Sequence, residues 1–332
     1  MRLSVLDQSP VISGHTPAEA IRATLDLAVA ADRMGYHRYW LAEHHAMKGL
    51  ADPAPEILLG QVAARTARIR VGTGGVLLPY YSPLKVAEVF RMYEALFPGR
   101  IDLGIGRAPG GNMLTARALN AEGFLGEERF PTQVQELVGY LDDRLPAEYP
   151  FHAVKAMPAG STSPEVWLLG SSDYSGALSA YLGLRFAFAH FISAHGGPAV
   201  TRGYRKDFRP SYREATPYAI AAVFTICAPT QEEAERLASS IDLRRLQMLR
   251  GQEEPIATTA EALGSEYSND DRMLIQRERA RAVIGTPQLV KDRLIALQEQ
   301  FAADELMLIT ITGDYASRLR SYELLADAFA LH

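Results

Sequence analysis

Three adjacent ionisable residues, Glu43-His44-His45, follow an apolar run that begins at Arg38. The run has the character of a β-strand, and successive side chains of a strand point to opposite faces, so Glu43 and His45 share one face and His44 takes the other. A neutral imidazole titrates near physiological pH and serves as an acid, a base or a metal ligand. The segment therefore predicts a catalytic site at a strand end, with a hydrogen-bonded subunit contact as the alternative.

Two further segments have residues suited to binding an anion. Gly170-Ser171-Ser172 lies between an apolar run and a helical pattern, where free N–H groups, two hydroxyls and the helix dipole can hold a phosphate. The alternative is an ordinary N-cap formed by Ser172 or Asp173. Arg107 follows another apolar run, and its guanidinium could bind the same phosphate or form a surface ion pair. Together the two segments favour a phosphorylated cofactor.

Glycines and two more histidines occupy similar positions. Gly74 and Gly75 end an apolar run, where they would let a flat ligand approach the backbone, permit an irregular strand, or form a simple turn. His190 follows a further run and either lines the pocket or caps its strand. His195 stands beside a Gly-Gly-Pro sequence, which predicts a loop position. We therefore expect a pocket that is built from several strand ends.

Several known catalytic signatures fail at specific positions. Pro109 stands where the dinucleotide fingerprint needs its third glycine, and Tyr174 stands where the nucleophile elbow needs its second. Glu43 and His45 lack a third metal ligand at suitable spacing, so no metal site is predicted. Cys227 is the only cysteine and lies in an apolar run, which predicts a buried, unreactive thiol.

Composition narrows the class of function. The chain has 332 residues, of which 48% are hydrophobic and 22% charged, as expected of a soluble globular protein. The net charge of −5 and the lack of a long basic run argue against nucleic-acid and membrane partners. We find no signal-peptide core and no apolar run of the roughly 18 to 20 residues that a membrane helix needs. The expectation is a cytoplasmic protein that acts on a small molecule.

Short apolar runs alternate with longer amphipathic ones along the whole chain, which is typical of parallel strands joined by crossover helices. Eight strands are predicted, near residues 2–6, 39–42, 69–72, 101–105, 166–169, 185–189, 218–226 and 305–310. They predict a (β/α)8 TIM barrel with insertions at the carboxyl-terminal face, with an open doubly wound sheet as the alternative. We expect one domain over residues 1–332, within which the polar stretch 251–282 forms a lid or excursion.

The chain resembles the bacterial luciferase-like flavin monooxygenase family, and in particular its single-component luciferase family oxidoreductase subgroup. The resemblance covers essentially the whole chain, because similar segments occur in the family's order. These segments are residues 41–45, 71–79 with 82–83, 100–111, 168–174, and 304–309 with 321–325.

This resemblance implies a TIM barrel, usually a homodimer, that receives reduced FMN from a separate NAD(P)H:flavin reductase. Reduced flavin and O2 would form a C4a-hydroperoxide that oxygenates an aldehyde, an alkane or a sulfur compound. By position, His44 would be the acid/base, and Arg107, Ser171 and Ser172 would hold the phosphate. Gly74-Gly75 would run beside the isoalloxazine ring.

The resemblance also implies roles outside this set of residues. Residues 251–282 would form a mobile loop that shields the reaction from water. Glu43 and His45 would brace the strand or a subunit contact. Luciferase has a cysteine at the position of Gly106, so monooxygenation is expected without light emission. Two alternatives stay open, which are F420-dependent hydride transfer and a non-catalytic flavin-binding protein.

Overall fold

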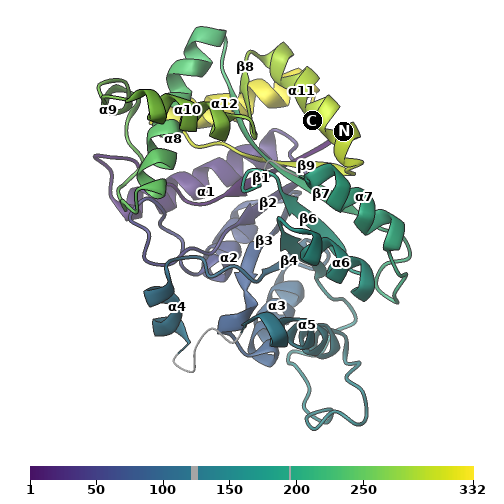
Figure 1. The fold of residues 1–332 in the computed structure, drawn as a ribbon. Helices are drawn as coiled ribbons and strands as arrows, with labels where there is room; N and C mark the ends of the chain where they lie inside the picture. Colours follow the sequence, from purple (N-terminus) through teal and green to yellow (C-terminus); the bar gives the residue numbers. More distant parts are fainter. Residues whose placement is uncertain (121–125, 194–195) are drawn as a thin grey trace.

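The computed structural model describes residues 1–120, 126–193 and 196–332 (Figure 1), so His195 lies outside the described residues. Its strands are β1 (Arg2–Asp7), β2 (Arg38–Leu41), β3 (Arg70–Leu77), β4 (Ile101–Gly106), β5 (Glu165–Gly170), β6 (Arg185–Ala189), β7 (Ala219–Cys227), β8 (Ala282–Gly285) and β9 (Glu305–Ile309). Its helices are α1 (Pro17–Arg33), α2 (Pro55–Arg65), α3 (Pro83–Leu96), α4 (Met113–Leu119), α5 (Gly126–Asp142), α6 (Asp173–Leu182), α7 (Gly197–Asp207), α8 (Gln231–Leu249), α9 (Thr259–Leu263), α10 (Asn269–Arg279), α11 (Pro287–Phe301) and α12 (Tyr315–Phe329), with a short 3-10 turn η1 (Leu78–Tyr80).

Eight parallel strands close into a ring in the order β1-β2-β3-β4-β5-β6-β7-β9, in which β9 pairs with both β7 and β1. Helices surround this ring (Figure 1). The predicted TIM barrel is therefore confirmed, and the open sheet is wrong. In this ring β5 stands opposite β1, because three strands separate them in either direction.

Several helices begin where short polar residues satisfy free backbone N–H groups. At the start of α1, the hydroxyl of Thr16 accepts the N–H of Glu19 at 3.3 Å, and the Glu19 carboxylate accepts the N–H of Thr16 at 2.7 Å. Thr258 and Glu261 form the same reciprocal pair before α9. These capping boxes fix the points at which the chain leaves a loop and enters a helix.

One predicted strand needs correction. The third, expected to end at Gly72, continues to Leu77, so Gly74 and Gly75 lie inside β3 and not in a turn. The pairing of β3 with β4 shifts by one residue between Gly74 and Val76, and this irregularity interrupts the alternating pattern of the sequence.

The polar stretch 251–282 also contained more structure than expected. Its last residue begins β8, which pairs with the carboxyl-terminal half of β7 outside the closed ring. The sequence did not predict β8, because four residues directly after a charged helix are too short for a periodic pattern. The rest of the stretch contains α9 and α10, which pack against α8.

A buried ion-pair cluster fills the amino-terminal end of the barrel. Arg38 donates to Asp102 at 2.7 Å, to Glu165 at 2.8 Å and to Glu305 at 3.1 Å. The indole N–H of Trp40 also donates to Asp102, at 2.9 Å. Arg38, Asp102 and Glu305 are almost completely buried, so within the described residues this end of the barrel is closed. In the described part of the chain, the interior is therefore open to ligands from the carboxyl-terminal end only.

Three loops at that end are joined by backbone hydrogen bonds. The N–H of Val11 donates to the carbonyl of Gly49 at 2.9 Å, and the N–H of Ile256 donates to the carbonyl of Val11 at 2.8 Å. Arg244 of α8 donates to the carbonyl of Glu254 at 2.8 Å. The loop that follows β2 is thus held by the loop after β1, which in turn is held by residues 250–258.

Candidate active site

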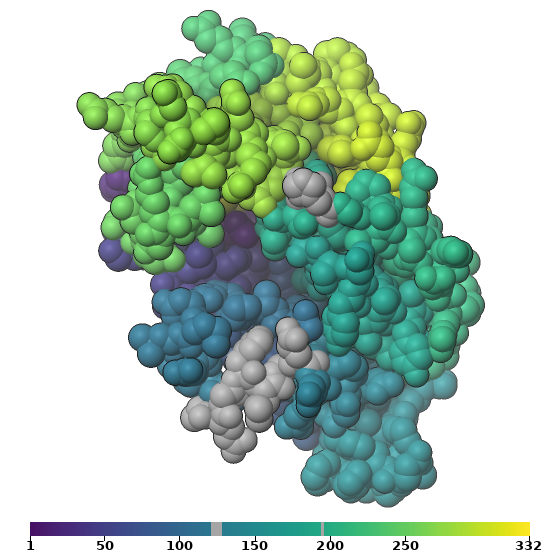
Figure 2. Space-filling view, viewed as in Figure 1, coloured from purple at the N-terminus to yellow at the C-terminus, as the bar shows by residue number. Residues whose placement is uncertain are grey.

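A cavity of about 280 Å³ opens at the carboxyl-terminal end of the barrel. Figure 2 shows the surface hollowed on this side, with the amino-terminal part of the chain at the bottom of the hollow. Most of its wall is apolar, and the polar side chains come from the ends of β1, β2, β4 and β5 together with the start of α6. These polar residues are Gln8, Glu43, His44, Arg107, Ser171, Ser172, Tyr174 and Ser175.

His44 lines this cavity just beyond the end of β2. Its backbone N–H donates to the carbonyl of Asp52 at 2.9 Å, which fixes the chain at this point. Its Nδ1 is buried and has no hydrogen-bond partner in the described part of the chain. Burial lowers the pKa of His44 to about 4, and the nearby His45 and Arg244 act in the same direction. His44 is therefore a neutral imidazole with one nitrogen free to exchange a proton.

The side-chain carboxyl of Asp52, whose backbone carbonyl accepts the N–H of His44, is buried. Its Oδ1 accepts the N–H of Ala54 at 3.1 Å, whereas its Oδ2 has no partner within the described ranges. Burial raises the pKa of Asp52 to about 7. An unfolded aspartate has a pKa of about 3.9, so the folded state binds more protons between these two values, and stability falls as the pH rises from about 4 to about 7.

We expect the substitution Asp52→Asn to remove this part of the pH dependence of stability, because an amide does not titrate. The thermal unfolding midpoint of the wild type, measured from about pH 5 to about pH 8, should fall relative to that of the variant. Asp26→Asn, on the exposed face of α1, is the matched control and should follow the wild type. Parallel curves for the wild type and Asp52→Asn would contradict this expectation.

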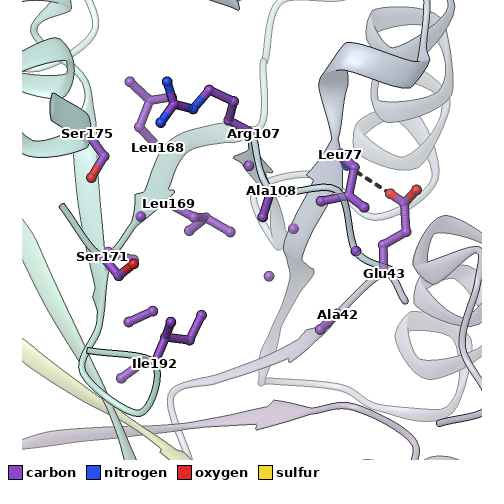
Figure 3. A pocket seen from close by; sticks show the side chains of 18 of the residues that line it. Ala42, Glu43, Leu77, Arg107, Ala108, Leu168, Leu169, Ser171, Ser175 and Ile192 are labelled. Atoms are coloured by element: carbon purple, nitrogen blue, oxygen red, sulfur yellow. Dashed lines mark hydrogen bonds between the residues drawn. The ribbon is translucent and has the colours of Figure 1, made fainter. Parts of the chain in front are cut away.

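Glu43 is buried and accepts three hydrogen bonds. Its carboxylate accepts the N–H of Leu77 at 2.8 Å (Figure 3), the hydroxyl of Tyr81 at 2.7 Å, and a bond of 2.7 Å from Nε2 of His45. Glu43 thereby ties the end of β2 to the end of β3. Glu43 and His45 thus brace this segment, but Glu43 also lines the cavity beside His44, so the two residues are not separated onto opposite faces as the strand pattern predicted.

We expect Glu43→Leu to destabilise the protein by about 3 kcal/mol, because three donors lose their acceptor in a buried place. Urea unfolding followed by circular dichroism measures this change. Glu299→Leu, on the exposed surface of α11, is the matched control and should change stability by less than about 0.5 kcal/mol. Equal stability of the two variants would show that Glu43 does not brace this part of the barrel.

Gly74 and Gly75 expose their backbone to the cavity. The peptide bond between them is cis. A Cβ atom on Gly74 would lie 2.6 Å from a methyl of Leu6, and one on Gly75 would lie 2.6 Å from the carbonyl oxygen of Gly104. A larger residue does not fit without movement of these neighbours. The glycines therefore provide a bare strip of backbone, as a flat ligand requires.

The loop after β5 and the start of α6 form the polar side of the cavity. Ser172 is the N-cap residue of α6, as one alternative predicted, and it lines the cavity with Gly170 and Ser171. The hydroxyl of Ser175 donates to the carbonyl of Ser172 at 2.7 Å and accepts its N–H at 3.4 Å. A Cβ atom on Gly170 would lie 2.2 Å from this hydroxyl oxygen, so only glycine fits there.

Arg107 lies on the same side of the cavity, beyond the end of β4. Figure 3 shows its guanidinium above the cavity, with Ser171 and Ser175 along the neighbouring chain. The guanidinium carbon is 4.6 Å from the centre of the Tyr174 ring, which holds the cation by a cation–π contact. The structure thus brings Arg107 and the serine loop together, as the sequence analysis expected.

His190 does not line the cavity, so the pocket-lining interpretation of this residue is wrong. Ala187 and Ala189 of β6 face the cavity, and the alternation of a strand then directs His190 to the outer side. Its ring packs edge-on against Phe301, with the two ring centres 5.2 Å apart. Burial lowers the pKa of His190 and keeps the ring neutral.

Sequence reasoning missed Gln8 and Ser175. Gln8 could have been found from its spacing, because it follows Leu6 by two residues on a strand whose end faces the cavity. Ser175 had no comparable signal, since its role depends on a backbone turn. Cys227 is buried, and burial raises its pKa to about 12, which confirms the unreactive thiol.

The described residues contain neither a cluster of metal ligands nor a helix that could span a membrane. No three His, Cys, Asp or Glu side chains in ranges 1–120, 126–193 and 196–332 gather closely enough to hold a metal ion. None of the described helices combines the length and the apolar character that crossing a membrane requires.

Comparisons with known proteins agree with this geometry. The family model for luciferase-like monooxygenases matches residues 1–304. The N-acetyl-S-alkylcysteine monooxygenase of Bacillus subtilis is 36% identical over 333 residues, which cover 99% of this chain and 98% of the relative. The crystal structure of apo-MsnO8 is 39% identical, with a TM-score of 0.92 over 100% of this chain and 98% of that one.

A more distant structure shares the fold alone. It is the oxygenating constituent of 3,6-diketocamphane monooxygenase from Pseudomonas putida in complex with FMN, which is 19% identical, with a TM-score of 0.73 over 99% of this chain and 97% of that one. The family match and the full-length relative confirm the resemblance found in the sequence, and with it the prediction of a flavin-dependent oxidoreductase. The chain belongs to the luciferase-like monooxygenase family.

Proposed function

We propose that this protein is an FMN-dependent monooxygenase that uses reduced FMN and O2 to oxygenate a small organic substrate. The observation that carries the proposal is one cavity whose wall includes the bare backbone of Gly74-Gly75, the proposed anion-binding groups Arg107 and Ser171, and His44, whose Nδ1 has no partner in the described part of the chain. The aldehydes, alkanes and sulfur compounds of the sequence-based expectation are the proposed substrate classes.

The residues of the cavity fit FMN. The Arg107 guanidinium, the hydroxyls of Ser171 and Ser172 and the first N–H groups of α6 supply donors for a phosphate. Gly74 and Gly75 present only backbone to the cavity, which allows a flat ring to approach β3 closely. The wall between these points is apolar, which suits an aromatic ring system.

FMN supplies the chemistry that activates O2 when it is bound in its reduced form. The chain's own groups handle protons and exclude water. Nδ1 of His44 takes up a proton and returns it, and its pKa of about 4 makes the protonated imidazole a ready donor. The apolar wall keeps water away, and residues 251–282 are the proposed lid that completes this exclusion.

The substrate class receives support from a full-length relative, whose name states that it acts on N-acetyl-S-alkylcysteine. A thioether sulfur is apolar and fits the aliphatic wall formed by residues such as Leu169 and Ile192 (Figure 3). Sulfur compounds are therefore the first class to test.

The proposal includes two protein partners. A separate NAD(P)H:flavin reductase in the cytoplasm would deliver reduced FMN. A second copy of the chain would form a homodimer, for which the exposed apolar residues Ile57 of α2 with Met92 and Leu96 of α3 supply a surface. Size-exclusion chromatography with light scattering measures this state, and a monomer at micromolar concentration would contradict the dimer.

The decisive experiment combines cofactor binding with turnover. Purified protein should quench FMN fluorescence, and with reduced FMN it should consume O2 and convert a member of a panel of aldehydes and thioethers. Failure to bind oxidised or reduced FMN would overturn the proposal. Preferential binding of F420 in competition would favour hydride transfer instead. Release of hydrogen peroxide that no substrate alters would favour a flavin-binding protein without turnover.

A further inference from the structure

The side chain of Gln8 is a polar group in the cavity wall to which the reaction described above assigns no task. Leu6 and Gln8 both line the cavity, whereas Asp7 between them points outward and is fully buried. This alternation continues the pattern of β1 and directs the amide of Gln8 into the barrel. Gln8 therefore faces whatever the cavity binds.

The backbone on both sides of Gln8 is firmly held. Asp7 accepts a hydrogen bond of 2.7 Å from Arg318 of α12 and one of 2.7 Å from the N–H of Ser9. Ser9 adopts a φ of +50°, and its hydroxyl accepts a hydrogen bond of 3.0 Å from Thr24. A non-glycine residue keeps a positive φ only where its surroundings enforce it. The position of Gln8 is thus fixed before any ligand arrives.

The amide of Gln8 has no hydrogen-bond partner within ranges 1–120, 126–193 and 196–332, and the side chain is only partly exposed. A half-buried carboxamide in a largely apolar wall loses free energy unless a ligand or water satisfies its donor and its acceptor. The same wall includes Leu6, Ala42 and His44, of which only His44 is polar. The geometry leaves both ends of the amide available to a ligand.

The place of Gln8 in the ring indicates which ligand this is. β1 stands opposite β5, whose end carries the serine loop at the anion-binding side. Gly74 and Gly75 of β3 lie midway between them. A ligand that is anchored by its phosphate near Ser171 and crosses the glycines would present its far end to β1 and β2. Gln8 and His44 lie at this far end, beyond β1 and β2.

We propose that Gln8 binds the imide edge of the flavin ring, an inference that rests on the proposed use of FMN. This edge has one N–H, at N3, between two carbonyl groups. A primary carboxamide is its complement, because its oxygen accepts the N3–H while its NH2 group donates to a neighbouring carbonyl. Of the polar residues that line the cavity in the described part of the chain, Gln8 alone offers a donor and an acceptor in this paired arrangement.

The test uses FMN and N3-methyl-FMN, in which a methyl group replaces the N3 hydrogen. Dissociation constants from flavin fluorescence should be about tenfold larger for N3-methyl-FMN with the wild-type protein, because one hydrogen bond is lost and the amide is displaced. In Gln8→Leu, FMN should bind about tenfold more weakly, and the two flavins should differ by less than about threefold. Gln288→Leu, on the exposed surface of α11, is the matched control and should keep the wild-type discrimination.

The outcomes separate this inference from the function on which it rests. Equal affinity of the wild type for both flavins would overturn the role of Gln8 and leave FMN binding intact. Discrimination that persists unchanged in Gln8→Leu would also overturn it. Absence of FMN binding by the wild type would overturn the proposed function and this inference together. The comparison of two flavins on the wild type needs no variant, so a misfolded Gln8→Leu would not prevent the test.

Discussion

Replacement of His44 by alanine is expected to lower product formation by about 100- to 10,000-fold and to leave the affinity for FMN nearly unchanged. The reason is that His44 offers the cavity one nitrogen without a partner among the described residues and contributes no group to the proposed anion-binding side. Product is measured by mass spectrometry after a single turnover with reduced FMN, and FMN affinity by fluorescence titration. Loss of a proton-handling group should lower product formation and leave the affinity for FMN unchanged.

The pH profile gives an independent readout for His44. Because its pKa is about 4, the wild-type value of kcat/KM should show no loss from His44 between neutral pH and about pH 5 and should fall only as the pH approaches 4. His190→Ala, a change of a second buried histidine outside the cavity, is the matched control and should keep the activity. Equal loss of FMN binding and product formation in His44→Ala would assign His44 a structural role instead.

Replacement of Arg107 by alanine is expected to produce the opposite result. FMN binding should weaken by about 1.5 to 3 kcal/mol, or roughly 10- to 150-fold, if the guanidinium makes a charge-assisted bond to the phosphate. Riboflavin lacks this phosphate, so its affinity should change much less. The ratio of the two affinities, measured by fluorescence titration, isolates the contribution of the phosphate.

The chain offers a close control for this substitution. The guanidinium of Arg209 lies 4.6 Å from the centre of the Tyr181 ring, the same distance that separates Arg107 from Tyr174, but outside the cavity. Arg209→Ala removes an equivalent cation–π contact and should leave FMN binding unchanged. An Arg107→Ala variant that binds FMN as tightly as the wild type would rule out Arg107 as the phosphate ligand.

The sequence predicted those parts of the fold and the site that depend on local patterns. Alternating apolar runs and helical patterns were enough to predict the barrel, because parallel strands need crossover helices. The ends of these runs located His44, Arg107 and Ser171, since all carboxyl-terminal strand ends of a barrel meet at one face. The structure brings these three residues to one cavity.

The remaining features depend on details that a single sequence does not specify. The direction of the His190 side chain could be predicted only with the exact register of β6, because a shift of one residue exchanges the inner and outer faces of a strand. The sequence pattern places Gly74 and Gly75 after the end of a strand, because the shifted pairing that keeps them inside β3 is a property of β3 and β4 together. β8 is defined by its pairing with β7 and has no pattern of its own.

The closed floor of the barrel has a kinetic consequence. With Arg38, Asp102 and Glu305 filling one end, the proposed cofactor and organic substrate would share one entrance, and the ligand that sits deeper would arrive first and depart last. Steady-state kinetics should then follow a compulsory order of addition. An excess of the outer ligand should trap the inner one and slow its exchange, a form of inhibition that a barrel open at both ends would not show.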